Sequence, residues 1–120
     1  MPHVSYIEFN VPDAQKASAF YKQIFAWEAK GWGGDQDYLI AAHGEEPGID
    51  TALRKAPDGK PLSVAIITVP SLDETLRAVQ SAGGVVVVEK FPIAGVGYAA
   101  YFTDPGGLIV GIHEYDENAK

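Results

Sequence analysis

Residues Tyr101–Glu114 read YFTDPGGLIVGIHE, and the central Asp104-Pro105-Gly106-Gly107 predicts a tight turn between two apolar segments. Proline fixes φ, glycine accepts a positive φ, and an aspartate side chain accepts hydrogen bonds from nearby backbone N–H groups. We therefore expect a β-hairpin that joins the last two strands of the chain.

The second strand of this hairpin presents two different faces, because successive side chains of a strand alternate. One face is aliphatic and is expected to meet the core; it carries Leu108, Val110 and Ile112. The other face carries Ile109, Gly111 and His113. A glycine and a histidine are unusual on a face that only packs, so this is the face on which we look for function.

An internal repeat sets the predicted fold. Val11-Pro12-Asp13 and Val69-Pro70-Ser71 each end a predicted strand and begin a helix, 58 positions apart. Each half reads β-α-β-β-β, and its sheet cannot bury both faces alone, so we expect the halves to pair. The sequence predicts an α+β fold, with two tandem βαβββ modules forming a curled mixed sheet around a cleft and the helices outside. It predicts one domain over residues 1–120, with module 1 at about 3–55, a linker at about 56–61 and module 2 at about 62–115.

Local signals place the elements. Asp13 is expected to cap a first helix with an apolar stripe, and Ser71 with Glu74 has capping-box spacing before the second helix. Around 26–29 the chain is expected to leave the helix and enter a short strand, which a turn over 31–35 ends. A further strand is expected over 85–88. Trp27 is expected to pack behind the first helix, and the acidic residues Glu114, Asp116 and Glu117 are expected to form an exposed tail.

Composition excludes several classes of function. The chain has 120 residues, a formal net charge of −7, no cysteine and no run of 18 apolar residues. Phosphate backbones and anionic lipid surfaces repel such a chain, and cysteine-based nucleophiles or zinc ligands are absent. We expect a cytoplasmic protein that binds neither nucleic acid nor membrane.

The order of these features resembles the vicinal oxygen chelate superfamily, which includes glyoxalase I, extradiol dioxygenases, fosfomycin-resistance enzymes and bleomycin-resistance proteins. The resemblance covers essentially the whole chain. It rests on the paired modules, on Phe20-Tyr21 followed by Ile24-Phe25-Ala26-Trp27, and on Asp104-Pro105-Gly106-Gly107. The resemblance implies a divalent metal in the cleft, held by His and Glu side chains from the first and last strands of the modules, and it implies a homodimer.

Carried over by register, the ligand positions of the family fall on Tyr6, Val64 and Gly111. Valine and glycine have no side chain that binds a metal, and a neutral tyrosine is a poor ligand. We therefore expect no metal site and no cofactor.

Glu8 lies on the predicted face of Tyr6, and His113 lies on the face of Gly111. If both line the cleft, they are candidates for general acid–base catalysis or for holding a polar ligand group. Two alternatives stay open: the pair fills the cleft mouth by bonding to each other or to Tyr6, or it forms a non-standard metal site. Tyr98 belongs to a set of aromatic residues, with Trp32, Tyr38 and Tyr101, that can floor a pocket or pack as ordinary sheet residues. His3 and His43 are expected to be solvated.

The sequence therefore predicts a glyoxalase- and bleomycin-resistance-like protein that binds a small organic molecule without a metal. The candidate ligand-binding residues are Tyr6, Glu8, Val64, Tyr98, Gly111 and His113. One alternative is a lyase, isomerase or dioxygenase that uses a displaced metal site or acid–base chemistry through Glu8 and His113. Another is a non-catalytic domain that acts by dimerising.

Overall fold

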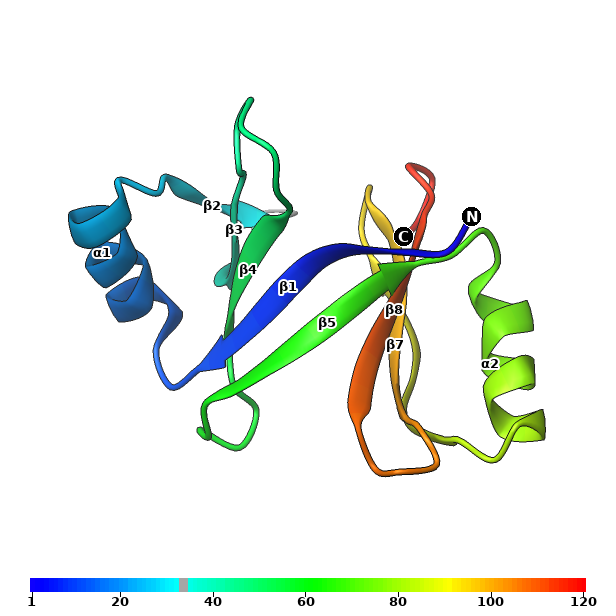
Figure 1. The fold of residues 1–120 in the computed structure, drawn as a ribbon. Coiled ribbons are helices and arrows are strands. Elements are labelled where there is room, and N and C mark those ends of the chain that lie inside the picture. The colour runs from blue at the N-terminus through cyan, green and yellow to red at the C-terminus, as the bar shows by residue number, and fades with distance from the viewer. Residues whose placement is uncertain (33–34) are drawn as a thin grey trace. The chain divides into compact units, whose positions relative to one another are not determined.

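The computed structural model describes residues 1–32 and 35–120 (Figure 1). In chain order the elements are β1 (His3–Val11), α1 (Ala14–Phe25), β2 (Ala29–Trp32), β3 (Asp35–Ala41), β4 (Asp50–Lys55), β5 (Leu62–Thr68), α2 (Leu72–Ser81), β6 (Val85–Ile93), β7 (Gly97–Thr103) and β8 (Ile109–Tyr115). The α+β class and the twofold βαβββ repeat are confirmed.

The chain divides into two compact units, one of residues 5–64 and one of residues 1–4 and 65–120, called here the first and second unit. In the first, the strand order is β2-β3-β4-β1, with β1 parallel to β4. In the second, it is β5-β8-β7-β6, with β5 parallel to β8. Each sheet is mixed, as predicted; that the two units make up one domain stays a prediction.

In the first unit, α1 packs against β3 and β4. Asp13 is the N-cap, as predicted, and its Oδ1 accepts a 3.0 Å hydrogen bond from the backbone N–H of Lys16. The core beneath the helix is built from Ala14, Leu39 and Leu53, with Phe9 and Tyr21 packed against it. Phe9 and Leu53 therefore mark the helix-facing side of this sheet, and the residues that alternate with them face away from α1.

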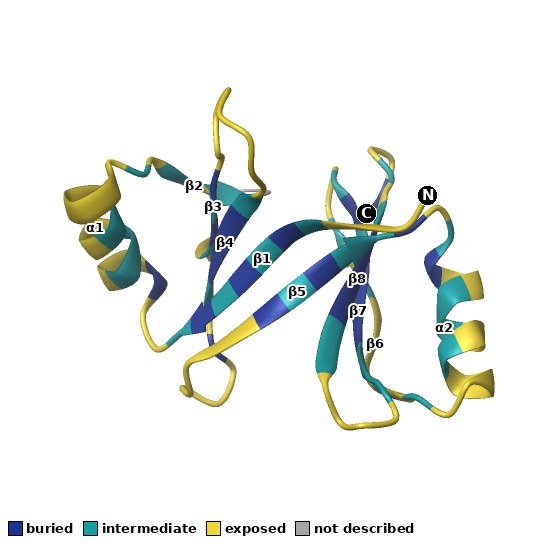
Figure 2. Cartoon of the chain, viewed as in Figure 1, coloured by how far each residue is buried: buried dark blue, intermediate teal, exposed yellow. Residues whose placement is uncertain are grey.

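The outer side of α1 is more apolar than a solvent-facing helix surface usually is. Phe20, Ile24 and Phe25 are each at least half exposed, and α1 is largely in the colour of exposed residues in Figure 2. Trp27 lies against Tyr21 and Phe25, with ring centroids 5.4 Å from each. This confirms that Trp27 packs behind the helix, whereas much of the predicted apolar stripe lies outside the core.

In the second unit, Ser71 caps α2 and its Oγ accepts a 3.2 Å hydrogen bond from the backbone N–H of Glu74. Oε1 of Glu114 accepts from the N–H of Leu72 at 2.8 Å. Glu114 was expected in an exposed tail, and this was wrong, because β8 extends to Tyr115 and brings Glu114 to the N-terminus of α2. A carboxylate is favourable there, where N–H groups lack helical partners. The core of this unit joins Val69, Leu72, Ala100 and Ile112.

The hairpin between β7 and β8 forms as predicted. Oδ1 of Asp104 accepts 2.9 Å hydrogen bonds from the N–H groups of Gly106 and Leu108, and Gly107 has φ +93°. Ile112 is buried, but Leu108 is 63% exposed. Its predicted place in the core was wrong, because the turn includes Leu108 and the strand begins one residue later.

Two strands differ from expectation. β2 spans Ala29–Trp32 and so extends into the turn predicted over 31–35, because Gly31 pairs with Leu39 and Trp32 with Asp35. β6 continues to Ile93, with register shifts that let it follow β7 beyond Val88. The centre of the turn predicted over 31–35, at 33–34, lies outside the described residues. Neither α1 nor α2, the helices of the described ranges, is long and apolar enough to cross a membrane.

Candidate ligand-binding site

A polar cluster lies on the face of the first sheet that points away from α1. Strand β1 supplies Tyr6, Glu8 and Asn10, β3 supplies Tyr38, and β4 supplies Arg54; these five residues are called here the Glu8 cluster. In the register of the sheet, Arg54 is paired with Asn10 on one side and with Tyr38 on the other. Paired residues point to the same face, so the fold of this unit brings the cluster together.

Glu8 is the centre of the cluster and is fully buried. The hydroxyl of Tyr38 donates to its Oε2 at 2.6 Å, and Nδ2 of Asn10 donates to its Oε1 at 3.1 Å. Nη1 of Arg54 lies 3.6 Å from the same Oε1. A buried carboxylate is costly unless hydrogen bonds and a counter-charge compensate for the lost water. Here Asn10 on β1 itself, Arg54 on β4 and Tyr38 on β3 supply them.

The network continues on both sides of Glu8. The hydroxyl oxygens of Tyr38 and Tyr6 lie 3.3 Å apart. Because the single hydroxyl proton of Tyr38 is directed at Glu8, Tyr6 is the donor in this contact. On the other side, Nη1 of Arg54 also donates to Oδ1 of Asn10 at 3.2 Å.

Aromatic rings surround the polar chain. The ring of Trp32 meets Tyr6 edge to face at 5.5 Å and lies tilted against Tyr38 at 5.4 Å between centroids. Trp32 and Tyr38 are only partly buried, and the Arg54 side chain keeps 28% of its surface exposed. The face therefore exposes aromatic surface of Trp32 and Tyr38 and part of the Arg54 guanidinium.

In the second unit, neighbours fill the space beside Gly111. Gly111 is paired with Ile66 on β5 and with Tyr101 on β7. A Cβ at position 111 would collide with Cδ1 of Ile66 and come within 3.1 Å of the Tyr101 ring. The position that carries a glutamate ligand in the resemblance is thus closed to any larger side chain unless its neighbours move.

His113 is fully buried on β8, with the ring of Tyr115 edge to face at 4.5 Å. Burial lowers the pKa of His113 from 6.5 to about 4, and the negative charge of Glu114 opposes this shift only in part. The imidazole is therefore neutral at physiological pH, with one nitrogen as a donor and the other as an acceptor.

The predicted site residues fall into separate sets. Tyr6 and Glu8 are brought together in the first unit, whereas Val64 is a buried residue of β5 without a polar side chain. Tyr98 packs against the core beneath α2, with Nζ of Lys90 4.5 Å from its ring centre, on the opposite face of β7 from Tyr101. Glu8 and His113 belong to different units, and their pairing stays a prediction.

Asn10 and Arg54 were missed by sequence reasoning, and Tyr38 was noted only as an aromatic residue. Asn10 alternates with Glu8 along β1, which is a signal that the sequence already contains. Arg54 had no such signal, because the parallel pairing of β1 with β4 is a long-range contact.

The residues present do not fit the metal that the resemblance implies. Across residues 1–32 and 35–120, no three His, Asp or Glu side chains are grouped so as to hold an ion. In the first unit, the Glu8 oxygens are engaged by Tyr38, Asn10 and Arg54, and Tyr and Asn are weak ligands beside a guanidinium.

The family model of the Glyoxalase/Bleomycin resistance protein/Dioxygenase superfamily matches residues 3–112. The chain belongs to this superfamily. A comparison with curated proteins found no match.

Solved structures share the fold of this glyoxalase-superfamily chain. A hypothetical protein from Bacillus halodurans C-125 has a TM-score of 0.72 at 20% identity, covering 99% of this chain and 98% of that one. The methylmalonyl-CoA epimerase of Mycobacterium tuberculosis has a TM-score of 0.62 at 17% identity, with 93% and 87% covered. The Mn(II)-bound glyoxalase of Novosphingobium aromaticivorans has a TM-score of 0.62 at 24% identity; the match covers 99% of this chain and 41% of that one. At these identities the likeness concerns the fold.

Proposed function

We propose that this superfamily member binds a small organic molecule without a metal, on the face of the first sheet that carries the Glu8 cluster. The observation that carries the proposal is the complete engagement of a buried carboxylate by Tyr38, Asn10 and Arg54. A carboxylate held by hydroxyl, amide and guanidinium groups is arranged to orient polar groups rather than to ligate an ion.

The rings beside the cluster support the same proposal. Small-molecule sites combine apolar and aromatic walls with a few fixed polar groups. Trp32, Tyr38 and Tyr6 contact one another as a set, and the polar network fixes the positions of both tyrosines.

The two tryptophans of the chain, Trp27 and Trp32, allow a direct test. Trp27→Phe leaves Trp32 as the single indole, beside the Glu8 cluster, and Trp32→Phe leaves Trp27 behind α1 as the matched control. We expect compounds from a small-molecule library to change the fluorescence of the Trp32 reporter but not that of the Trp27 reporter, with equal affinity before and after chelation.

Elemental analysis of the purified protein completes this test. We expect substoichiometric zinc, nickel, manganese and iron, both as isolated and after incubation with each ion. About one firmly held ion per chain, together with ligand binding that chelation abolishes, would contradict the metal-independent proposal.

A second candidate is an enzyme that uses acid–base chemistry through Glu8 and His113. The neutral, buried imidazole of His113 favours it, since such a group can accept or relay a proton. This candidate requires that Glu8→Gln or His113→Ala abolish turnover of a substrate found by screening while the protein stays folded; unchanged turnover in both variants would exclude it. A cytoplasmic location and a homodimer stay predictions, and sedimentation at micromolar concentration tests the dimer.

A further inference from the structure

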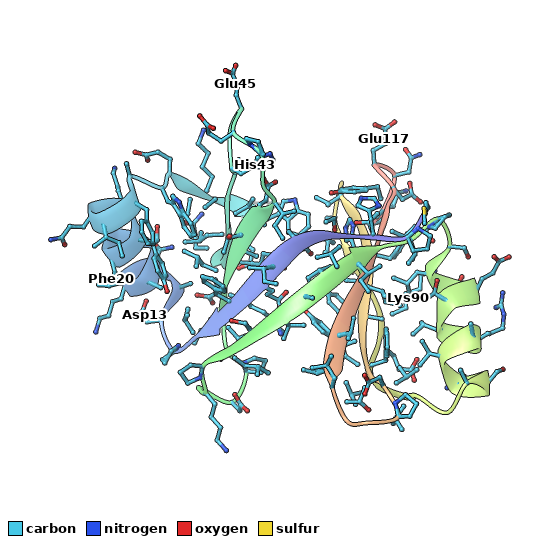
Figure 3. All side chains as sticks on the ribbon, in the orientation of Figure 1. Asp13, Phe20, His43, Glu45, Lys90 and Glu117 are labelled. Carbon is cyan, nitrogen blue, oxygen red and sulfur yellow. The ribbon has the colours of Figure 1, made fainter. Side chains whose placement is uncertain are left out.

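A second pair of polar side chains lies outside the Glu8 cluster, with His43 in the loop between β3 and β4 and Asp50 at the start of β4. Nδ1 of His43 lies 2.7 Å from Oδ1 of Asp50, and the backbone N–H of His43 donates to the same oxygen at 3.1 Å. Figure 3 shows His43 at the base of the loop whose tip carries Glu45. Both side chains are 40% exposed, so a ligand can reach this pair, in contrast to Glu8.

The contacts of His43 fix the chemistry that it offers. An ionised aspartate only accepts hydrogen bonds, so a neutral imidazole bound to it carries its proton on Nδ1 and a lone pair on Nε2. A Cβ at position 48 would come within 3.8–4.0 Å of the His43 side chain, so the glycine there leaves this side of the ring uncovered. Asp50 thus orients the ring while Nε2 keeps its capacity to accept.

The register places this pair next to the Glu8 cluster. Asp50 begins β4 and is paired with Tyr6 on β1. Asp50 and Arg54 lie an even number of residues apart, so they face the same side of the sheet as Tyr6 and Glu8. Asp50, which bonds the His43 ring, therefore lies beside Tyr6, on the face that also carries Glu8 and Arg54.

We propose that His43, oriented by Asp50, accepts the hydroxyl proton of a phenolic ligand whose ring packs against the aromatic side chains beside Tyr6. The inference rests on the proposed function and adds the ligand class, because a flat ring matches the aromatic surface and a hydroxyl donor matches Nε2. The proton stays on the ligand oxygen and is shared in a hydrogen bond, and no covalent step is involved.

The test compares 4-cresol with 4-methylanisole, which keeps the ring and the oxygen but has no proton to donate. Binding is measured by calorimetry at pH 8. We expect wild-type protein to bind 4-cresol roughly five- to tenfold more tightly than 4-methylanisole, which corresponds to the net free energy of one hydrogen bond. The imidazole ¹⁵N resonances of His43 should shift on addition of 4-cresol but not of 4-methylanisole.

His43→Leu should remove the preference for 4-cresol. Asp50→Asn should reduce it, because the carboxylate that keeps the proton on Nδ1 of His43 is lost. His3→Leu, at the other exposed histidine, is the matched control and should retain it. An unchanged preference in His43→Leu, or in Asp50→Asn if the first variant does not fold, would overturn the inference. If neither compound binds while the Trp32 reporter detects another ligand, the phenol assignment is wrong and the proposed function stands. If the reporter detects no ligand at all, both the phenol assignment and the proposed function are wrong.

Discussion

The hydroxyl of Tyr38 donates a 2.6 Å hydrogen bond to Oε2 of Glu8 across the intervening strand β4. On β4, Arg54 is paired with Tyr38, and Ala52, which is fully buried, is paired with Glu8. A small side chain at this position lets a tyrosine and a glutamate from strands that are not adjacent meet above it. The position of Glu8 therefore depends on a contact that neither β1 nor β3 provides alone.

Tyr38→Phe removes this hydrogen bond and keeps the ring. We expect a loss of about 1–3 kcal/mol in the free energy of unfolding, since the carboxylate remains buried with one partner fewer. Chemical denaturation measures it. Tyr115→Phe is the matched control, because Tyr115 is 63% exposed, and it should change stability by less than about 0.5 kcal/mol. Equal effects of the two variants would contradict the role of Tyr38.

Arg54→Met keeps much of the aliphatic stem and removes the positive charge near Glu8. The guanidinium is partly exposed and 3.6 Å from Oε1, so we expect a modest loss of about 1–2 kcal/mol. Arg77→Met on exposed α2 serves as the control and should be nearly neutral. In a double-mutant cycle with Glu8→Gln, the two losses should be less than additive; strict additivity would show that Arg54 does not compensate for Glu8.

Gly111→Ala tests the close packing of the second sheet. The added methyl meets Cδ1 of Ile66 and the Tyr101 ring, and overpacking of this kind costs about 1–3 kcal/mol. Ile66→Val removes the colliding methyl and should recover part of the loss in the double variant. Gly106→Ala, where the nearest neighbour is 3.4 Å away, should be tolerated. Thermal unfolding of these variants and of the wild type distinguishes steric conflict from a general intolerance of alanine.

His113 predicts how stability depends on pH. Its pKa is lowered to about 4 in the folded protein, so between about pH 6.5 and 4 the unfolded chain binds the proton more readily. Folding stability should therefore fall as the pH drops through this window and level off below about 4, by up to about 3 kcal/mol from this residue. His113→Leu should flatten that part of the curve relative to wild type. Parallel curves for the two proteins would mean that His113 titrates normally.

The repeat and its helix caps were predictable from sequence because their signals are local. Asp13, Ser71 and Asp104 each bond to backbone N–H groups within four residues along the chain. The extent of β2 and β6 was not predictable, since it depends on pairing with β3 and β7. Leu108 was misplaced because the alternation of a strand was extended into a turn.

The candidate site was predictable in the same uneven way. Tyr6 and Glu8 follow from alternation within one strand. The contributions of Arg54 and Asp50 depend on the parallel register of β1 and β4, which pairs them with Asn10 and Tyr6. That long-range pairing is visible only in the structure. Tyr98 was grouped with the site residues as an aromatic, and the side of β7 that packs beneath α2 became apparent only in three dimensions.

The filled space beside Gly111 also limits which substitutions this position accepts. Exchanging glycine for glutamate at that position is a small genetic step, yet the longer side chain would meet Ile66 and Tyr101 at once. A carboxylate there would need room on β5 and β7, the strands that carry Ile66 and Tyr101. A single substitution at position 111 is therefore expected to disturb the packing of three strands before it could add an acidic side chain to this face.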